Sequence, residues 1–282
     1  MPLDPTANKA SAQAMRPEFS SACERCSGLC CVALCFSTVD GFPYNKPDGE
    51  PCRHLQADSR CELHSTLAQR GLKGCIAFEC FGAGQQLTQA RQNGQQTPQN
   101  TTLIFRAFLA LRQLRELLWY LRDALDAAPM LRPQLLALQR ETEALTTQPV
   151  EQMATFDVQP QRVKINTLLL QTSELVRTAA RKGAPPIRIA GKPLQRGADL
   201  AAADLRKADL VGANLRGACL IAANMSNTKL FSADLIGADL RDAQVHGADM
   251  IGSLFLTQAQ LNQAKGDAAT RLPPHLFRPA HW

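Results

Sequence analysis

Residues 198–252 read ADLAA ADLRK ADLVG ANLRG ACLIA ANMSN TKLFS ADLIG ADLRD AQVHG ADMIG, which is eleven five-residue units in one register. The third residue of every unit is apolar, and the first is Ala except in the unit that begins with Thr228. A period of five suits neither regular element, because five residues rotate a side chain by about 140° on an α-helix and reverse its face on a flat strand. The apolar residues can share one interior only if the backbone turns a corner in every unit.

The pattern therefore predicts a solenoid of very short strands. The first and third residues of a unit point the same way, so small Ala alternates with large Leu in a narrow core. The second residue, Asp or Asn in most units, points outward, where its side chain can bond to backbone at the corner. The repeated Ala-Asp/Asn-Leu-x-x unit resembles the pentapeptide-repeat family. That resemblance implies a right-handed quadrilateral β-helix with four units per coil.

Composition narrows the class of protein. The net charge of +6 lies mainly in the helical middle and in residues 183–197, without a dense basic stripe. The strict repeats carry five basic against seven acidic residues, so we expect no nucleic-acid partner. No apolar signal-peptide core occurs in residues 1–22, and no uncharged apolar run reaches about 18 residues. We therefore expect a cytoplasmic protein with no membrane segment.

We expect a multidomain α+β fold in six segments. They are a mobile N-terminal arm (1–22), a metal-stabilised cysteine-rich head (23–82), a linker (83–100), a three-helix antiparallel bundle (101–183), the β-helix (184–270) and a C-terminal capping tail (271–282). Bundle helices are predicted from about Thr101 to Pro129, from Pro133 to Thr146 and from Pro160 to Lys182.

The first bundle helix carries an apolar seam at alternating steps of four and three: Ala107, Leu111, Leu114, Leu118, Leu121 and Leu125. Such a seam packs either in an intrachain core or across a homodimer. We favour the intrachain core because two partner helices follow in the same chain.

The end of the solenoid breaks the register. Residues 253–258 read as a six-residue unit before 259–261 restore the pattern, and the extra residue predicts a bulge or a loosened corner. The open end of a solenoid must be covered. We expect Leu276, Phe277 and Trp282 of the tail to lie on the end or side of the coil.

The head holds nine of the ten cysteines. Its C-x-x-C spacing lets two thiolates reach one ion across a tight turn, and distant cysteines can complete the coordination. Zn²⁺ and iron–sulfur clusters both favour thiolates, so these residues leave the cofactor open between them. The many Gly, Pro and polar positions make a poor apolar core, so a metal would supply stability that the core lacks.

The order of these motifs, a C-x-x-C…C-C opening, a Pro-Cys-x-x-Leu middle and a Cys-x-Leu-His segment, resembles the zinc- or iron-chelating cysteine-cluster family. By that resemblance the metal ligands are Cys23, Cys26, Cys30, Cys31, Cys52, Cys61, Cys75 and Cys80. Cys35 lies outside the pattern and is expected to be a buried small side chain. His54 or His64 is an alternative to one thiolate, and a structural role is at least as common for such a histidine.

The sequence contains no phosphate-binding loop, nucleophile elbow, H-E-x-x-H motif or paired catalytic carboxylates. We therefore expect a non-enzymatic protein-interaction module with a metal-binding head, although the cysteines leave the question of an enzyme open. The alternative is an iron–sulfur redox or metal-handling protein. A third hypothesis, from the pentapeptide resemblance, is a topoisomerase-binding DNA mimic, which we disfavour because the repeats are short and nearly charge-balanced.

Overall fold

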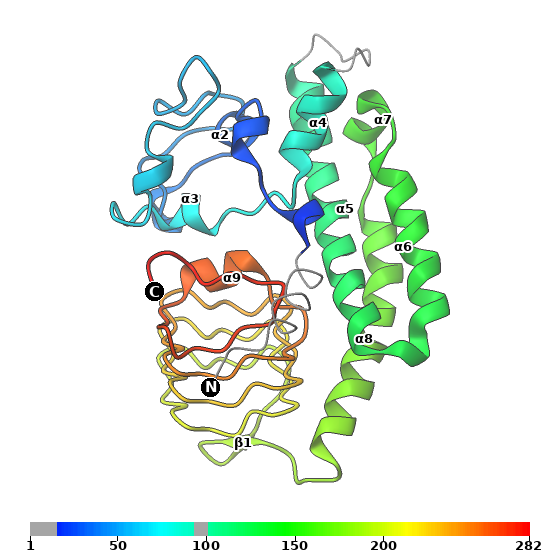
Figure 1. Ribbon diagram of the computed structural model, residues 1–282, viewed down its shortest axis with the longest axis vertical. Helices are drawn as coiled ribbons and strands as arrows, with labels where there is room; N and C mark the ends of the chain where they lie inside the picture. The colour runs from blue at the N-terminus through cyan, green and yellow to red at the C-terminus, as the bar shows by residue number, and fades with distance from the viewer. Residues whose placement is uncertain (1–15, 93–100) are drawn as a thin grey trace, which may run out of the picture. The chain divides into compact units, whose positions relative to one another are not determined.

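The computed structural model describes residues 16–92 and 101–282, so the first fifteen residues of the predicted arm and the end of the predicted linker lie outside it. The chain divides into two units, Glu18–Leu169 and Leu170–Trp282, the latter with Met1–Pro17. The helices are α2 (Leu29–Ala33), α3 (Lys73–Ala77), α4 (Ala83–Gln92), α5 (Thr101–Ala127), α6 (Arg132–Thr146), α7 (Val150–Thr155), α8 (Gln159–Arg181) and α9 (Gln258–Gln263), and the strands are β1 (Arg188–Ile189) and β2 (Lys192–Pro193) (Figure 1). No helix of the described residues combines the length and apolarity needed to cross a membrane.

Helices α5 and α6 and the start of α8 build the core of the unit Glu18–Leu169. The predicted seam of α5 is no more than 6% exposed at any of its six residues. Helix α5 contacts α6 and α7, and Gln161 of α8 donates a hydrogen bond to Thr142 of α6 at 3.0 Å. The chain's own helices therefore occupy the seam, as expected for an intrachain core.

Besides the short helices of the head, two helices of this unit, α7 and α4, were not predicted. Helix α7 inserts Met153, 1% exposed, beside α5. Helix α4 occupies the first half of the predicted linker and also contacts α5, so the prediction of a linker is wrong for residues 83–92. Its Ala, Gln, Leu and Arg residues are good helix formers, and packing on α5 stabilises what their propensity favours.

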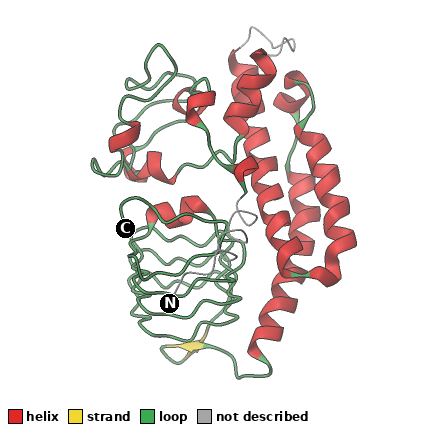
Figure 2. Ribbon diagram, in the orientation of Figure 1, coloured by secondary structure: helices red, strands yellow, loops and turns green. Residues whose placement is uncertain are grey.

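The unit Leu170–Trp282 contains the solenoid. Parallel bridges join second-position residues twenty positions apart, from Asp199 with Cys219 to Asp234 with Leu254. Twenty residues are four five-residue units, so each coil has four sides, as predicted. Figure 2 draws these coils as loop because each side contributes one bridging residue and not a full strand. The third-position residues from Leu200 to Met250 are no more than 8% exposed and fill the interior.

The corner of each unit lies at its fourth and fifth residues. All eleven fifth residues, from Ala202 to Gly252, have φ between 54° and 70°. The turn is closed by backbone, as when the Ala203 N–H donates to the Leu200 carbonyl at 3.0 Å. The Asp or Asn side chain accepts from the fourth residue's N–H, as Asp199 does from Ala201 at 3.1 Å. The repeated acidic row thus has the structural role predicted for it.

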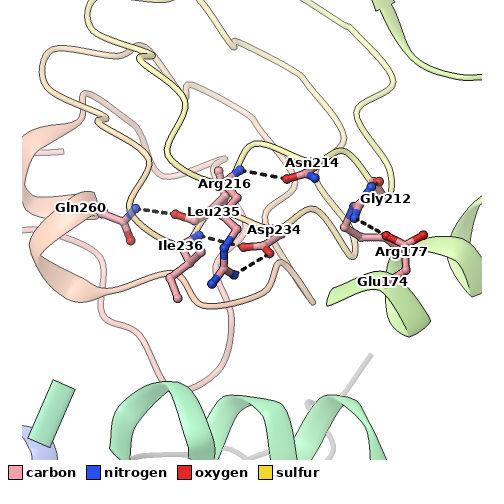
Figure 3. A network of polar contacts seen from close by, with 9 residues as sticks. All are labelled: Glu174, Arg177, Gly212, Asn214, Arg216, Asp234, Leu235, Ile236 and Gln260. Atoms are coloured by element: carbon pink, nitrogen blue, oxygen red, sulfur yellow. Dashed lines mark hydrogen bonds and ion pairs between the residues drawn. The ribbon is translucent and has the colours of Figure 1, made fainter. Parts of the chain in front are cut away.

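The C-terminal half of α8 packs on one side of the coil. The guanidinium of Arg177 donates to the Gly212 carbonyl at 3.1 Å (Figure 3), and that of Arg181 donates to the Val211 carbonyl at 3.2 Å. A Cβ added to Gly212 would lie 2.8 Å from the Arg177 carbonyl oxygen. The absence of a side chain at Gly212 therefore permits this close approach.

Replacing Gly212 with Ala is expected to loosen α8 from the coil. The matched control is Gly217→Ala, because both glycines have φ of +65° but a Cβ at Gly217 meets nothing within 4 Å. Backbone strain is thus common to both, and the clash is specific to Gly212→Ala, which should cost about 1–3 kcal/mol more. Hydrogen exchange of residues 170–181 measures this, and equal exchange in the two variants would contradict it.

The strict repeat ends in helix α9 at one end of the coil stack, opposite β1 and β2 (Figure 1). The Thr257 hydroxyl accepts from the Gln260 N–H at 3.3 Å while the Gln260 side chain accepts from the Thr257 N–H at 2.9 Å, a reciprocal helix cap. Gln260 also donates to the Leu235 carbonyl at 2.8 Å and anchors α9 to the coil below. The predicted restart of the repeat at 259–261 is therefore wrong, while the extra residue is accommodated in this coil, since Gln244 bridges to Lys265 twenty-one positions later.

The tail lies against this end of the coil. The Trp282 indole N–H donates to the Ala264 carbonyl at 2.9 Å. Leu276 is 7% exposed, whereas Phe277 is 51% exposed and is held through its backbone, which exchanges hydrogen bonds of 2.9 and 3.0 Å with the Gln258 side chain.

The tail histidine is expected to make the stability of this unit fall with acid. Burial, and then the charge of Arg16, lower the pKa of His275 to about 3. In the unfolded chain the pKa of this histidine is about 6.5. Between that pH and the pKa of the folded protein, only the unfolded chain binds the proton. The stability of the fold is therefore unaffected by this group above pH ~6.5 and falls below it. The loss from this group should be roughly 2 kcal/mol at pH 5. Thermal melting at pH 7 and at pH 5 tests this. The stability lost from pH 7 to pH 5 should be smaller in His275→Gln than in the wild type. The control His64→Gln, at an exposed histidine, should lose as much as the wild type.

Candidate metal centre

The cysteine-rich head is built from short helices and loops in the unit Glu18–Leu169. Cys23 begins a single 3₁₀ turn that Cys26 follows directly, and Cys30 and Cys31 lie in α2. Helix α2 contacts α5, and the turn at Cys23 contacts α4. The unpredicted helix α4 therefore supports the first C-x-x-C motif.

Four of the cysteines line one small cavity of about 20 Å³: Cys23, Cys26, Cys30 and Cys80. We call them the cavity set. The rest of the wall is formed by Ser21, Ala22, Gly84, Gln85 and Phe108. A Cβ on Gly84 would lie 2.6 Å from the Cys26 sulfur, so the glycine leaves room for this thiol.

The other four candidates, Cys31, Cys52, Cys61 and Cys75, form what we call the loop set. Burial raises the pKa of Cys75 to about 12, and the next contributions come from the thiols of Cys31, Cys52 and Cys61. The Cys52 N–H donates to the Cys31 carbonyl at 2.9 Å, and Cys61 bridges to Leu55 just after Cys52. These contacts bring together cysteines that are up to 44 positions apart in the chain.

The two sets meet at the adjacent pair Cys30 and Cys31, whose sulfurs are 4.0 Å apart. Their hydrogen bond raises the pKa of Cys30 and lowers that of Cys31, which the Lys46 charge lowers further. Burial raises the pKa of Cys23 to about 11, with smaller contributions from Cys80, Cys26 and Cys31. Cys23 and Cys75 are therefore protonated at neutral pH, and a metal ion would have to displace their protons.

Each set has a cation beside it, buried in the case of Lys46 and half-buried in the case of Arg115. The Lys46 charge lowers the pKa of Cys31, and Arg115 of α5 lies beside the segment that carries Cys80, since it donates to the carbonyl of the next residue. Arg115 is held by its donation to the carbonyls of Phe81 and Glu18. Both positive charges could offset part of the negative charge that a thiolate–metal centre carries.

The donors fit a soft cation by type and grouping, but their present positions are not those of a closed site. Within residues 16–92 and 101–282, no three or more His, Cys, Asp and Glu side chains converge closely enough to hold one ion. Cys35 is exposed, so the expectation of a buried side chain is wrong. His54 is paired through Nδ1 with Glu62 at 2.5 Å, and His64 is exposed. Neither histidine belongs to either set.

The repeat region of the chain is similar in sequence to a known protein family, in agreement with the four-sided coil. Residues 196–230, 218–255 and 228–265 match the family described as pentapeptide repeats, in eight copies. Over 270 residues the chain is 48% identical to the uncharacterized protein YybG of Bacillus subtilis, covering 94% of this chain and 95% of that protein. The chain belongs to the same family as YybG, and its C-terminal region is a pentapeptide-repeat β-helix.

Proposed function

We propose that this is a non-enzymatic cytoplasmic protein in which the cysteine-rich head binds zinc and the β-helix presents a surface to another protein. The observation that carries the metal-binding part is the cavity of about 20 Å³ with four cysteines in its wall. Disulfides are rare in a reducing compartment. Cysteines that come together there from separate segments are therefore more often metal ligands than disulfide partners. On this proposal the head is a member of the zinc- or iron-chelating cysteine-cluster family that its motifs resemble.

The cavity favours zinc over an iron–sulfur cluster. One water molecule needs a space of at least roughly 10–15 Å³. The cavity of about 20 Å³ therefore accommodates one water molecule or one ion. A single ion is of that size, whereas a cluster of several iron and sulfide atoms would require the walls to move apart. The iron–sulfur redox function therefore remains the alternative.

The interaction part of the proposal rests on the pentapeptide β-helix. Phe231 on its surface is 51% exposed, and apolar side chains of this kind commonly anchor a protein partner. The acidic residues support a DNA mimic less well, because several are already paired with arginine: Asp204 with Arg206 at 2.6 Å and Asp239 with Arg241 at 2.7 Å. A partner bound through this surface should be retained by the wild type and lost by Phe231→Ser.

Elemental analysis and the visible spectrum of protein purified without oxygen test the metal. We expect zinc in whole-number stoichiometry, colourless protein and a lower melting temperature after chelation, because metal binding contributes to folding. Brown protein with iron, sulfide and absorbance near ~400 nm would instead establish the iron–sulfur alternative. Protein that neither retains nor takes up metal would refute the metal-binding function. Cys219→Ser, in the β-helix, is the control and should leave the metal content unchanged.

A further inference from the structure

We propose that Cys23 and Cys26 form a reversible disulfide by exchange with a low-molecular-weight disulfide such as oxidised glutathione. All ten cysteines are free thiols in this structure, so the proposal concerns a second covalent state of the head. Where disulfides do occur in a reducing compartment, they are mostly transient and serve redox sensing or catalysis. The inference goes beyond the proposed zinc binding and does not depend on it.

The backbone holds the two residues at the spacing that a disulfide needs. Residues Cys23–Arg25 form one 3₁₀ turn, and the Cys26 N–H closes it by donating to the Cys23 carbonyl at 3.2 Å. A 3₁₀ turn has three residues and rises by about 2 Å per residue, so Cα atoms three positions apart are separated by about 6 Å. Disulfides usually join Cα atoms that are about 4.4–6.8 Å apart. The bond can therefore form without unwinding the turn.

The two side chains also reach the same space, because both Cys23 and Cys26 line the cavity of about 20 Å³. Helix α4 fixes the chain on either side of the pair. Before it, the Gln85 side chain accepts from the Ala22 N–H at 2.7 Å, and after it, the Thr88 hydroxyl accepts from the Ser27 N–H at 3.0 Å. The C-x-x-C segment is thus ordered before the bond forms, and closing the bond orders little more of the chain.

The adjacent pair Cys30 and Cys31 is less suited to a disulfide, although their sulfurs are only 4.0 Å apart. The Cα atoms of neighbouring residues are about 3.8 Å apart across a trans peptide, which is shorter than the usual span of a disulfide. Helix α2 would have to distort to join them. The C-x-x-C pair meets the geometric requirement, and the adjacent pair does not.

Exposure sets the order of the reaction. Cys23 is exposed and Cys26 is half-buried, so an external disulfide reaches Cys23 first. The Cys23 thiolate attacks one sulfur of oxidised glutathione, which forms a mixed disulfide and releases one glutathione thiolate. The Cys26 thiolate then attacks the Cys23 sulfur and releases the second glutathione. In total, two protein thiols lose two electrons and two protons, and oxidised glutathione is reduced to two molecules of glutathione.

The disulfide would also withdraw two donors from the proposed metal centre, because the ligand of a metal ion is the thiolate. In a protein that holds zinc through Cys23 and Cys26, oxidation of the pair should therefore release the ion. The same bond should form in metal-free protein, where the exchange needs only the two thiols.

The test maps the disulfides of the full-length protein after equilibration with glutathione buffers of increasing oxidised fraction, at pH ~8.5 where more thiol is ionised. Thiols are then blocked and peptides are identified by mass spectrometry. We expect a Cys23–Cys26 bond in the wild type. Cys26→Ser should instead keep one glutathione on Cys23, because no second thiol displaces it. The controls Cys30→Ser and Cys80→Ser remove the other thiols of the cavity wall and should retain the bond.

The wild type alone decides the pairing, so the result does not depend on whether a serine variant folds. A bond from Cys23 to Cys30 or Cys80, or a lasting glutathione adduct on Cys23 of the wild type, would overturn the inference. So would Cys23 and Cys26 that stay reduced in a buffer that modifies the exposed thiol of Cys35.

Zinc content, measured on the same samples as purified and after chelation, keeps this inference apart from the proposed function. A Cys23–Cys26 bond in a protein that never binds metal would support the inference and refute zinc binding. A zinc protein whose two cysteines remain reduced even after chelation would support zinc binding and overturn the inference.

Discussion

Replacing Lys46 with Met is expected to unfold the cysteine-rich head in the absence of metal. Lys46 is only 4% exposed, and its ammonium donates to four backbone carbonyls: those of Val32 at 3.2 Å, Leu34 at 2.5 Å, Pro47 at 2.9 Å and Glu50 at 2.7 Å. Met has a similar length but no donor. Because carbonyls in a partly buried site then lose a charged partner, we expect a loss on the order of 3–5 kcal/mol.

The position of Lys46 explains why one side chain matters so much. Its backbone pairs with Phe36 through hydrogen bonds of 2.8 and 3.0 Å, and its ammonium lies 4.7 Å from the centre of the Phe36 ring. The residue thus ties the segment after α2 to the segment before Cys52. A head with few buried apolar side chains has little else to hold these two segments together.

Hydrogen exchange of residues 29–55 in metal-free protein measures the effect. Lys46→Met should expose these amides while leaving residues 198–252 protected, and Lys73→Met, at an exposed lysine of the same head, should change little. Lys46→Arg should not restore protection, because a planar guanidinium cannot donate to the same four carbonyls. Protection in Lys46→Met equal to that of the wild type would show that the lysine is not the organising contact.

The pentapeptide coil was predictable because every unit repeats the same pattern of apolar, small and polar residues. An apolar third residue and a small first residue recur in each unit, and one unit alone would have been ambiguous between helix and strand. The ends were not predictable from the period, because there the chain departs from it. Helix α9 did have a signal, since Thr257 followed by Gln260 is the sequence of a capping box, but the apparent return of the repeat at 259–261 concealed it.

The ligand types of the candidate centre were readable from the sequence, but their grouping was not. C-x-x-C spacing joins Cys23 with Cys26, yet nothing in the spacing assigns Cys30 and Cys31 to different sets. Lys46 and Arg115 are not part of any metal-binding motif. Arg115 lies in α5, 35 positions beyond Cys80 in the sequence. Such partners are brought to a site by tertiary packing, which periodicity and spacing do not report.

A second large effect is expected inside the β-helix, where Asp234→Ala should strongly destabilise the coil. The Asp234 side chain is 0% exposed, and its Oδ2 lies 3.2 Å from Nη1 of Arg216, whose side chain is 7% exposed (Figure 3). Removing the carboxylate takes away the ion pair that the buried guanidinium makes with Asp234. Breaking a buried pair in this way costs about 3–5 kcal/mol, more than the pair itself contributes to stability.

Asp239→Ala is a closely matched control. Asp234 and Asp239 hold the second position of consecutive units, and each accepts a backbone N–H two residues later, at 3.0 and 3.1 Å. The difference is the ion pair, because Asp239 and its partner Arg241 are 32% and 48% exposed. The loss of an exposed pair should cost less than about 1 kcal/mol, so the two variants together separate the buried pair from the corner hydrogen bond.

Hydrogen exchange over residues 198–252 of the full chain compares the free energies of opening in these variants. The double variant Arg216→Met with Asp234→Ala should recover much of the loss, since it removes both charges and fills the space with an apolar side chain. Recovery would locate the cost of Asp234→Ala in the lost ion pair with Arg216. If the double variant were as unstable as Asp234→Ala, or if Asp239→Ala were equally damaging, the corner hydrogen bond would be the dominant contribution of these aspartates.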